Sequence, residues 1–368
     1  MNDGIFNKKT GSKRVLVAPL DWGLGHATRC IPIIYELLEQ DSTVIIAAAG
    51  QTEILLKKEF PGLEFLPLRG YNIQYSRKKG WLPLKLFLQI PSIIAIIYHE
   101  HRWLKKIVRK NEIDCVISDN RFGLYHSSIP SIYITHQLLI KTGNDFTEKI
   151  LQKIHYHFIK KYTQCWVPDL EGDHSLAGAL SHPKNIPGNI KYTGPLSRFE
   201  KKPFDKKYDL LILISGPEPQ RSIFEKLLLA QLQTFNGVVL LVRGLPTNEL
   251  IDLQKNIIVK DHLGANELSE AIQRSTLVIT RSGYTTIMDL VKLQQKAVLV
   301  PTPRQTEQEY LATHLAEKKI FYTIEQGKFI LEDVLQQTKN TDLTIPVIDM
   351  QAYKKAITIL LAEIIINS

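Results

Sequence analysis

The chain alternates between apolar runs typical of buried strands and runs with helical spacing, and it does so in two separate stretches. In the first stretch the run at 14–20 is rich in branched apolar residues, whereas the run at 31–40 has apolar residues at helical spacing. Further strands are expected at 43–49, 114–119 and 131–136, and further helices at 52–60 and roughly 82–110. Buried strands that alternate with helices form parallel sheets with helices on both faces.

The alternation weakens between about 168 and 207, where prolines and glycines accumulate, and the end of this segment is typical of a linker. It restarts with strand-like runs at 208–215 and 238–244. We therefore predict an α/β fold with two Rossmann-like domains facing across a cleft. The predicted parts are an N-terminal domain at 1–195, a linker at 196–207, a C-terminal domain at 208–349, and a C-terminal helix within 350–368 that packs back on the N-terminal domain.

Charge and cysteine content narrow the functional classes. The 368 residues include 46 Lys and Arg against 37 Asp and Glu, a net charge of +9 that favours an anionic partner. The three cysteines, Cys30, Cys115 and Cys165, are widely spaced, so neither a disulfide framework nor a zinc site is indicated. A reduced, cytoplasmic setting fits this usage. We expect no secretory signal and no transmembrane helix, because the longest apolar run contains Pro91 and is too short.

The first predicted strand ends in PLDWGLGHATRC (19–30), where glycines lie between a strand and a helix. Gly23 and Gly25 permit a tight turn and close approach of a ligand to the backbone. Free N–H groups at the helix start favour an anion. His26 lies at the same end, where it could act as a base or contact a phosphate. The alternative is a strand–helix turn with a capping histidine.

Other strand exits of the first domain add polar candidates. Asp119 follows the strand at 114–119, and His136 and Gln137 end the next strand. In parallel sheets these exits share one edge, where ligands bind. A lone aspartate at such a place is also a common helix cap, so that reading stays open for Asp119.

The second domain repeats the arrangement of strand exits followed by polar loops. Ser215 and Gly216 follow one strand, and Asp289 lies nearly two helical turns after the Ser-Gly loop at 282–283. A carboxylate there could accept hydrogen bonds from a ribose diol, although it could equally be a solvated helix residue. The segment PTPRQTEQEYLA (301–312) supplies three groups able to bind hydroxyls: Gln305, Gln308 and Glu309.

Taken in order, these stretches resemble the two-domain GT-B glycosyltransferases, and most closely the MurG-like transferases with a family 28-type C-terminal domain. GLGHATR (23–29) is similar to the GxGHxxR loop of these transferases. TGPLSR (193–198) resembles their interdomain segment, and residues 278–319 resemble their donor-binding half. The resemblance implies a cytoplasmic, bacterial hexosyltransferase that uses a nucleotide diphosphate sugar, usually a UDP-sugar, with no cofactor.

The resemblance also assigns residues. It places the ribose contact at Asp289, the diphosphate loop and helix at Ser282, Gly283 and Thr286, the sugar contacts at Gln308 and Glu309, the linker arginine at Arg198, the base-reading backbone near Leu263, and the acceptor-side histidine at His26. Three features depart from the family pattern: Asp289 replaces a glutamate, Glu309 replaces a glutamine, and SGPEPQR (215–221) replaces a glycine-rich loop. The peptidoglycan substrate is therefore not assumed.

The predicted reaction is metal-independent glycosyl transfer. Helix N-termini, Arg198 and Arg281 would stabilise the negative charge of the leaving diphosphate. His26 or Asp119 would take the proton of the acceptor hydroxyl; His26 titrates in the useful range, whereas Asp119 would need a raised pKa.

Three alternatives remain at this stage. The loop is also similar to that of the nucleotide-sugar hydrolase of pseudaminic acid synthesis, in which water replaces the acceptor. A non-catalytic sugar-nucleotide binder is the second alternative. The third, nucleic-acid binding, is disfavoured because basic residues are scattered.

The expected acceptor is a sugar or a lipid-linked sugar. The basic-flanked apolar segment 77–110 is either a core helix or a peripheral membrane contact at the inner face.

Overall fold

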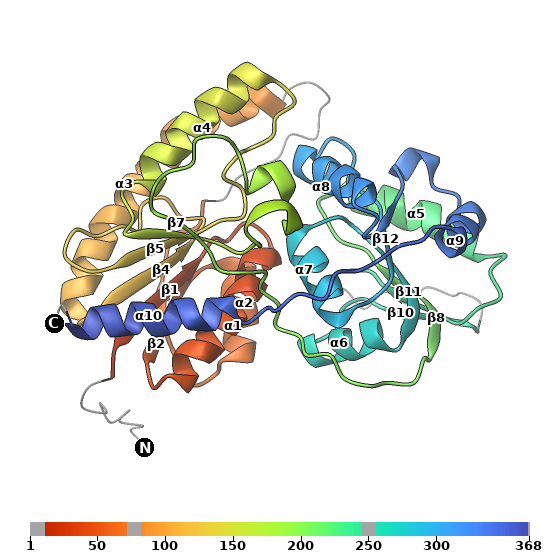
Figure 1. Ribbon diagram of the computed structural model, residues 1–368, viewed down its shortest axis with the longest axis horizontal. Coiled ribbons are helices and arrows are strands. Elements are labelled where there is room, and N and C mark those ends of the chain that lie inside the picture. The colour runs from red at the N-terminus through yellow and green to blue at the C-terminus, as the bar shows by residue number, and fades with distance from the viewer. Residues whose placement is uncertain (1–11, 72–81, 245–254, 367–368) are drawn as a thin grey trace.

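The computed structural model describes residues 12–71, 82–244 and 255–366, and within 82–90 it describes the backbone only. Two parallel sheets lie at opposite ends of the molecule, each flanked by its own helices (Figure 1). The predicted pair of Rossmann-like α/β domains is confirmed.

The N-terminal domain contains a seven-stranded sheet in the order β3-β2-β1-β4-β5-β6-β7, and every described pairing is parallel. Its strands are β1 (Arg14–Pro19), β2 (Thr43–Ala48), β3 (Glu64–Pro67), β4 (Cys115–Asp119), β5 (Ser131–Ile134), β6 (Gln164–Val167) and β7 (Ile190–Tyr192). Its helices are α1 (Leu24–Glu39), α2 (Gly50–Glu59), α3 (Leu82–Lys110) and α4 (Asp145–Ile159). β1, β4 and β5 are buried along almost their whole length, as their apolar runs predict.

The C-terminal domain contains a six-stranded sheet in the order β10-β9-β8-β11-β12-β13, again with parallel pairings. Its strands are β8 (Tyr208–Leu213), β9 (Val239–Val242), β10 (Ile257–Lys260), β11 (Ser275–Thr280), β12 (Ala297–Leu299) and β13 (Tyr322–Thr323). Its helices are α5 (Gln220–Leu232), α6 (Ala265–Gln273), α7 (Tyr284–Leu293), α8 (Thr306–Glu317) and α9 (Leu331–Asn340); α10 (Ala352–Ile366) follows.

Strand register brings the candidate residues to one edge of each sheet. Pro19 at the end of β1 pairs with Asp119 at the end of β4, and Asp119 pairs with Ile134 at the end of β5. In the second sheet Thr280 pairs with Leu213 and with Leu299. The polar segments that follow these strands therefore leave each sheet side by side.

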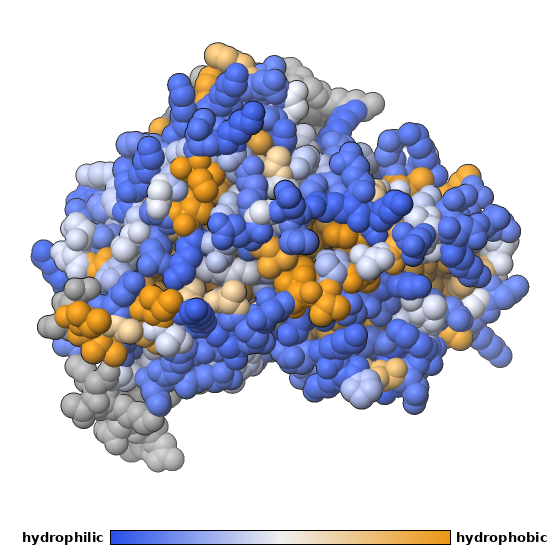
Figure 2. All heavy atoms as spheres, viewed as in Figure 1, coloured by the Kyte–Doolittle hydropathy of each residue, from blue (hydrophilic) through white to orange (hydrophobic). Residues whose placement is uncertain are grey.

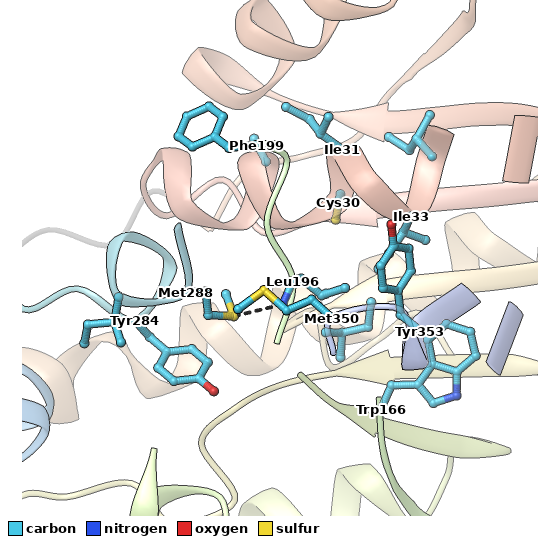
Figure 3. Packing of buried hydrophobic residues seen from close by; sticks show 14 of the residues in the cluster. Cys30, Ile31, Ile33, Trp166, Leu196, Phe199, Tyr284, Met288, Met350 and Tyr353 are labelled. Atoms are coloured by element: carbon cyan, nitrogen blue, oxygen red, sulfur yellow. Dashed lines mark hydrogen bonds between the residues drawn. The ribbon is translucent and has the colours of Figure 1, made fainter. Parts of the chain in front are cut away.

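The hydrophobic core continues across the boundary between the domains. Side chains from α1, α7 and the residues before α10 pack in one buried cluster, in which the Leu196 N–H lies 3.1 Å from Met288 Sδ (Figure 3). The chain then returns to the N-terminal domain, because α10 packs along α1 and Lys354 Nζ lies 2.9 Å from Glu36 Oε2 (Figure 1).

Helix α1 begins earlier than the sequence indicated. We expected a start near Ala27, but the helix begins at Leu24 and includes Pro32. His26 therefore lies within the first helical turn. Among the described residues no helix is both long and apolar enough to cross a membrane. Of the segment 77–110, residues 77–81 lie outside the described residues.

Candidate functional site

The N-termini of α1 and α7 meet at the junction of the domains. Gly23, with φ +85°, precedes α1, and Gly283 precedes α7. Thr285 Oγ1 lies 3.5 Å from the carbonyl oxygen of Gly25, and a Cβ on Gly25 would lie 3.0 Å from the same Oγ1. Gly25 thus permits the close approach. Each N-terminus carries unpaired N–H groups and about half a positive charge.

His26 and Asp119 form a hydrogen-bonded pair beside this junction. His26 Nδ1 lies 2.8 Å from Asp119 Oδ1. Arg29, one turn further along α1, donates from Nε to Asp119 Oδ2 at 2.7 Å and from Nη2 to Asp119 Oδ1. Residues three apart share a helix face, so His26 and Arg29 both reach the end of β4. Two sequence-predicted residues are thereby brought together.

The surroundings of Asp119 bear on whether it could act as the catalytic base, a role that the sequence left open for this residue. Burial alone would raise its pKa, but the charge of Arg29 and the hydrogen bonds from Arg29 and His26 hold the pKa of this fully buried carboxyl well below its ordinary value. A base role would require a raised pKa. The lowered pKa disfavours Asp119 as the proton acceptor, and the 2.8 Å contact makes it the hydrogen-bond partner of His26.

The same geometry assigns the ring proton of His26. His26 Nδ1 faces two groups, Asp119 Oδ1 at 2.8 Å and Arg29 Nη2 at 3.0 Å. An ionised carboxylate accepts and does not donate, so the shorter contact is a hydrogen bond only with the proton on Nδ1. In that tautomer Arg29 Nη2 donates to Asp119 Oδ1 and not to the ring. Nε2 then carries the lone pair. The His26 side chain is 17% exposed, so Nε2 belongs to a ring that solvent or substrate can reach.

His136 connects this pair to the second domain. Arg29 Nη1 donates to His136 Nδ1 at 3.0 Å, which leaves the proton on Nε2 to donate to Glu307 Oε1 at 2.8 Å. Its ring stacks on Tyr284, with centroids 4.3 Å apart. Burial lowers the pKa of His136, in keeping with a neutral ring. Gln137 is half-buried beside it, with Nε2 3.5 Å from His136 Nε2.

The Ser-Gly loop before α7 offers backbone rather than side-chain groups. Ser282 is fully buried and its hydroxyl donates to the Gln308 carbonyl at 2.8 Å. The hydroxyl is therefore used within the domain. The N–H groups that follow Gly283, up to Thr286, are the groups of this loop that could bind an anion.

Asp289 lies four residues beyond Thr285, about 6 Å further along α7. The carboxylate is 8% exposed and Oδ1 accepts from the Ser197 hydroxyl at 2.6 Å. Burial raises its pKa to about 6, although Ser197 and Arg198 oppose the rise. A carboxylate has about four acceptor positions, so a ribose contact does not require the loss of Ser197.

The two candidate arginines occupy different environments. Arg281 is 1% exposed; it donates to the carbonyls of Val300 and Gln220 and lies 4.2 Å from the Phe224 ring. These contacts give Arg281 a structural role within the domain, although its Nε is buried without a hydrogen-bond partner among the described residues. Its contact with the diphosphate stays a prediction. Arg198, in the linker, is half-buried beside Asp289, and its Nε is buried without a hydrogen-bond partner among the described residues.

The remaining donor-side candidates divide between inward and outward positions. Gln308 is buried, and its Oε1 accepts from Thr302 N at 2.9 Å, whereas Glu309 is exposed and accepts from Arg304 N at 2.8 Å. Gln305 precedes α8, and its Oε1 is buried without a partner among the described residues, as is Thr302 Oγ1. Ser215 and Gly216 lie in an exposed loop, and a Cβ on Gly216 would lie 3.5 Å from Thr302 Oγ1; Leu263 is half-buried against the core.

Sequence reasoning missed Arg29, Glu307, Tyr284 and Ser197 as parts of the site. A signal existed for Arg29, because its three-residue spacing from His26 places both on one helix face. The others touch the site only through the contact between domains. In the described part of the chain no three His, Cys, Asp or Glu side chains cluster as metal ligands would.

Comparison with known proteins finds similarity over most of the second domain. Residues 248–358 match the glycosyltransferase family 28 C-terminal domain. An uncharacterised glycosyltransferase of Methanosarcina acetivorans is 23% identical over 316 residues, 80% of this chain and 81% of that protein. A UDP-N-acetylglucosamine–N-acetylmuramyl-(pentapeptide) pyrophosphoryl-undecaprenol N-acetylglucosamine transferase of Histophilus somni is 32% identical over 78 residues, 21% of this chain and 22% of that protein. The first relative is archaeal, so such sequences are not restricted to bacteria.

Solved structures agree on the fold. The glycotransferase of kitacinnamycin has a TM-score of 0.64 at 13% identity, covering 97% of this chain and 96% of that chain. MurG of Acinetobacter baumannii has a TM-score of 0.53 at 14% identity, with 95% of each chain covered. The two-domain arrangement is the GT-B fold.

Proposed function

We propose that this chain, a GT-B glycosyltransferase with a family 28 C-terminal domain, moves a sugar from a UDP-sugar to a hydroxyl acceptor, with His26 as the base. The observation that carries the proposal is the meeting of the α7 N-terminus with the His26–Asp119 pair at one junction. One side suits a diphosphate and the other suits a hydroxyl that must lose its proton.

The donor is argued from the α7 end of the site. First-turn N–H groups after Gly283 would bind the diphosphate, and Arg198 would approach it from the linker. Asp289 would accept from the ribose, and the unpartnered Oε1 of Gln305 would accept from a sugar hydroxyl. The UDP moiety is favoured by the Histophilus relative, whose name states a UDP-sugar donor. The uracil would lie near Leu263.

The chemical step follows from the His26 tautomer. The acceptor oxygen attacks the anomeric carbon while the bond from that carbon to the diphosphate breaks and its electron pair leaves with the diphosphate. The acceptor proton passes to His26 Nε2. Asp119 stabilises the resulting imidazolium through Nδ1, as a buried carboxylate does in other catalytic pairs.

A panel of nucleotide sugars tests the donor proposal. A UDP-sugar should raise the melting temperature more than other nucleotide sugars, because ligand at a hundred times Kd adds about 2.7 kcal/mol. Transfer to an added sugar or lipid-linked acceptor should be lost in His26→Gln and should persist in EDTA, since the proposed step uses no metal or cofactor. Fast, complete sugar release without acceptor would instead identify a hydrolase. Unchanged behaviour of His26→Gln would indicate a binding protein.

The acceptor could reach the site from a membrane surface. Within the described part of α3, Ile96 and Leu104 are buried, which supports a core helix. Ile94 and Tyr98 on the same helix are 59% and 62% exposed. On the face in Figure 2 hydrophobic side chains form separate patches on a largely hydrophilic surface. Salt-sensitive co-sedimentation with anionic liposomes would support a lipid-linked acceptor, and its absence would favour a soluble one.

A further inference from the structure

Glu307, in the C-terminal domain, is joined to the His26–Asp119 pair of the N-terminal domain through a continuous chain of hydrogen bonds between side chains. From Glu307 the chain passes to His136, then to Arg29, and then to Asp119 and His26. We propose that Glu307 is a positioning residue whose negative charge favours proton uptake by His26 only while the two domains are in contact. This inference rests on the proposed function of His26.

The first argument is the orientation of Arg29. Its guanidinium is 2% exposed, and Asp119 accepts from both Nε and Nη2. His136 accepts from Nη1 and completes the fork. Because a guanidinium is planar and rigid, a fixed His136 ring also fixes the plane of Arg29 relative to Asp119.

The second argument is that both donor-domain contacts of His136 come from helix starts at the junction. Glu307 lies in the first turn of α8 and Tyr284 is the first residue of α7. Separation of the domains would remove the acceptor of His136 Nε2 and its stacking partner together. The contact with His136 therefore depends on the relative position of the domains, as closure-dependent catalytic groups do.

The third argument is the balance of charge. The titratable or charged groups around the pair are Arg29 and Cys30 on α1, Asp119 at β4, His136 after β5, Tyr284 on α7 and Glu307 on α8. With both imidazoles neutral, Arg29 and Asp119 cancel and Glu307 leaves one negative charge. Its carboxyl pKa is lowered: burial would raise it, but His136, then Gln137 and then His26 lower it. A nearby negative charge favours the protonated form of His26.

The test uses two variants of α8 in the intact chain. Glu307→Gln keeps an oxygen that can accept from His136 but removes the charge. Tyr310→Phe is the matched control, since Tyr310 accepts from Ala179 N at 2.8 Å across the same junction without joining the chain of bonds. Proton uptake by His26 is followed by NMR without any donor, and His26→Gln identifies the signal. If Glu307→Gln does not fold, Glu307→Ala replaces it.

We expect the midpoint of His26 proton uptake to fall in Glu307→Gln and to stay unchanged in Tyr310→Phe. In the transfer assay kcat should fall about tenfold with the donor KM retained. An unchanged midpoint in Glu307→Gln, or an equal shift in Tyr310→Phe, would overturn the proposal. Because the titration needs no donor, its result is separate from whether the chain transfers sugar.

Discussion

The N-termini of α1 and α7 meet at the domain junction, and each carries a partial positive charge. The charged groups around the two N-termini differ. At α1 the protein supplies its own charges: Asp119 and Arg29 are buried together, with His26 at their edge. At α7 the loop residues Ser282 and Gly283 offer N–H groups and no buried ion pair. The α1 end is thus organised by the protein's own charges, whereas Ser282 and Gly283 supply no counter-charge to the positive end of α7. Under the proposed function the diphosphate would supply that charge.

Removing the buried carboxylate of the α1 end should have the largest effect. Asp119→Asn leaves Arg29 without its counter-charge, and breaking a buried pair in this way costs about 3–5 kcal/mol of unfolding free energy. Transfer should fall about 10²–10⁴-fold because His26 loses its orienting partner. Urea unfolding and initial rates measure the two effects. The matched control is Asp114→Asn at the other end of β4, where a half-buried carboxylate accepts from Arg14 N; equal losses in both variants would contradict the account.

A second prediction concerns Arg281, which precedes the Ser-Gly loop at the N-terminus of α7. We assign it a structural role, not the stabilisation of charge on the diphosphate. Arg281→Met should lower the unfolding free energy by about 2–4 kcal/mol, because several carbonyl groups lose a buried donor. The folded variant should bind UDP as the native chain does, whereas Arg198→Met should bind it more weakly at little cost in stability. Isothermal titration gives the affinities. A large loss of UDP affinity in Arg281→Met alone would reverse the two roles.

Asp289 makes the stability of the C-terminal domain depend on pH between about 4 and 6. Its pKa of about 6 exceeds the ordinary 3.8, so the folded chain holds this proton more firmly than the unfolded chain. Unfolding free energy should therefore fall as pH rises from about 4 to about 6, by at most about 3 kcal/mol from this group. Asp289→Asn should flatten that part of the stability curve. UDP affinity should weaken below about pH 6, where the carboxyl is protonated; a pH-independent affinity would remove Asp289 from the ribose site.

The smallest expected effect concerns the contact between the two helix starts. Gly25→Ala places a Cβ 3.0 Å from Thr285 Oγ1, so the hydroxyl must move by a few tenths of an ångström. We expect transfer to fall by roughly twofold to fivefold, equivalent to less than about 1 kcal/mol. The double variant with Thr285→Ala should recover the native rate. Failure to recover would mean that Gly25 acts on something other than the approach of α7.

Most of the fold could be predicted from the sequence because buried parallel strands and amphipathic helices leave different periodicities. The predicted residues His26 and Asp119 meet because register aligns β1 with β4. The roles of Asp119 and Arg281 could not be predicted, since a pKa depends on Arg29 and on burial, and Arg281 is oriented by carbonyls from other loops. Glu307 was missed because its partner His136 is in the other domain.

A crystal structure of the chain with UDP tests the central claim most directly. The account predicts the diphosphate within hydrogen-bond distance of the N–H groups that follow Gly283, the ribose at Asp289, and His26 across the junction from the terminal phosphate. A diphosphate bound on another face, with the α7 N-terminus occupied by water alone, would contradict it.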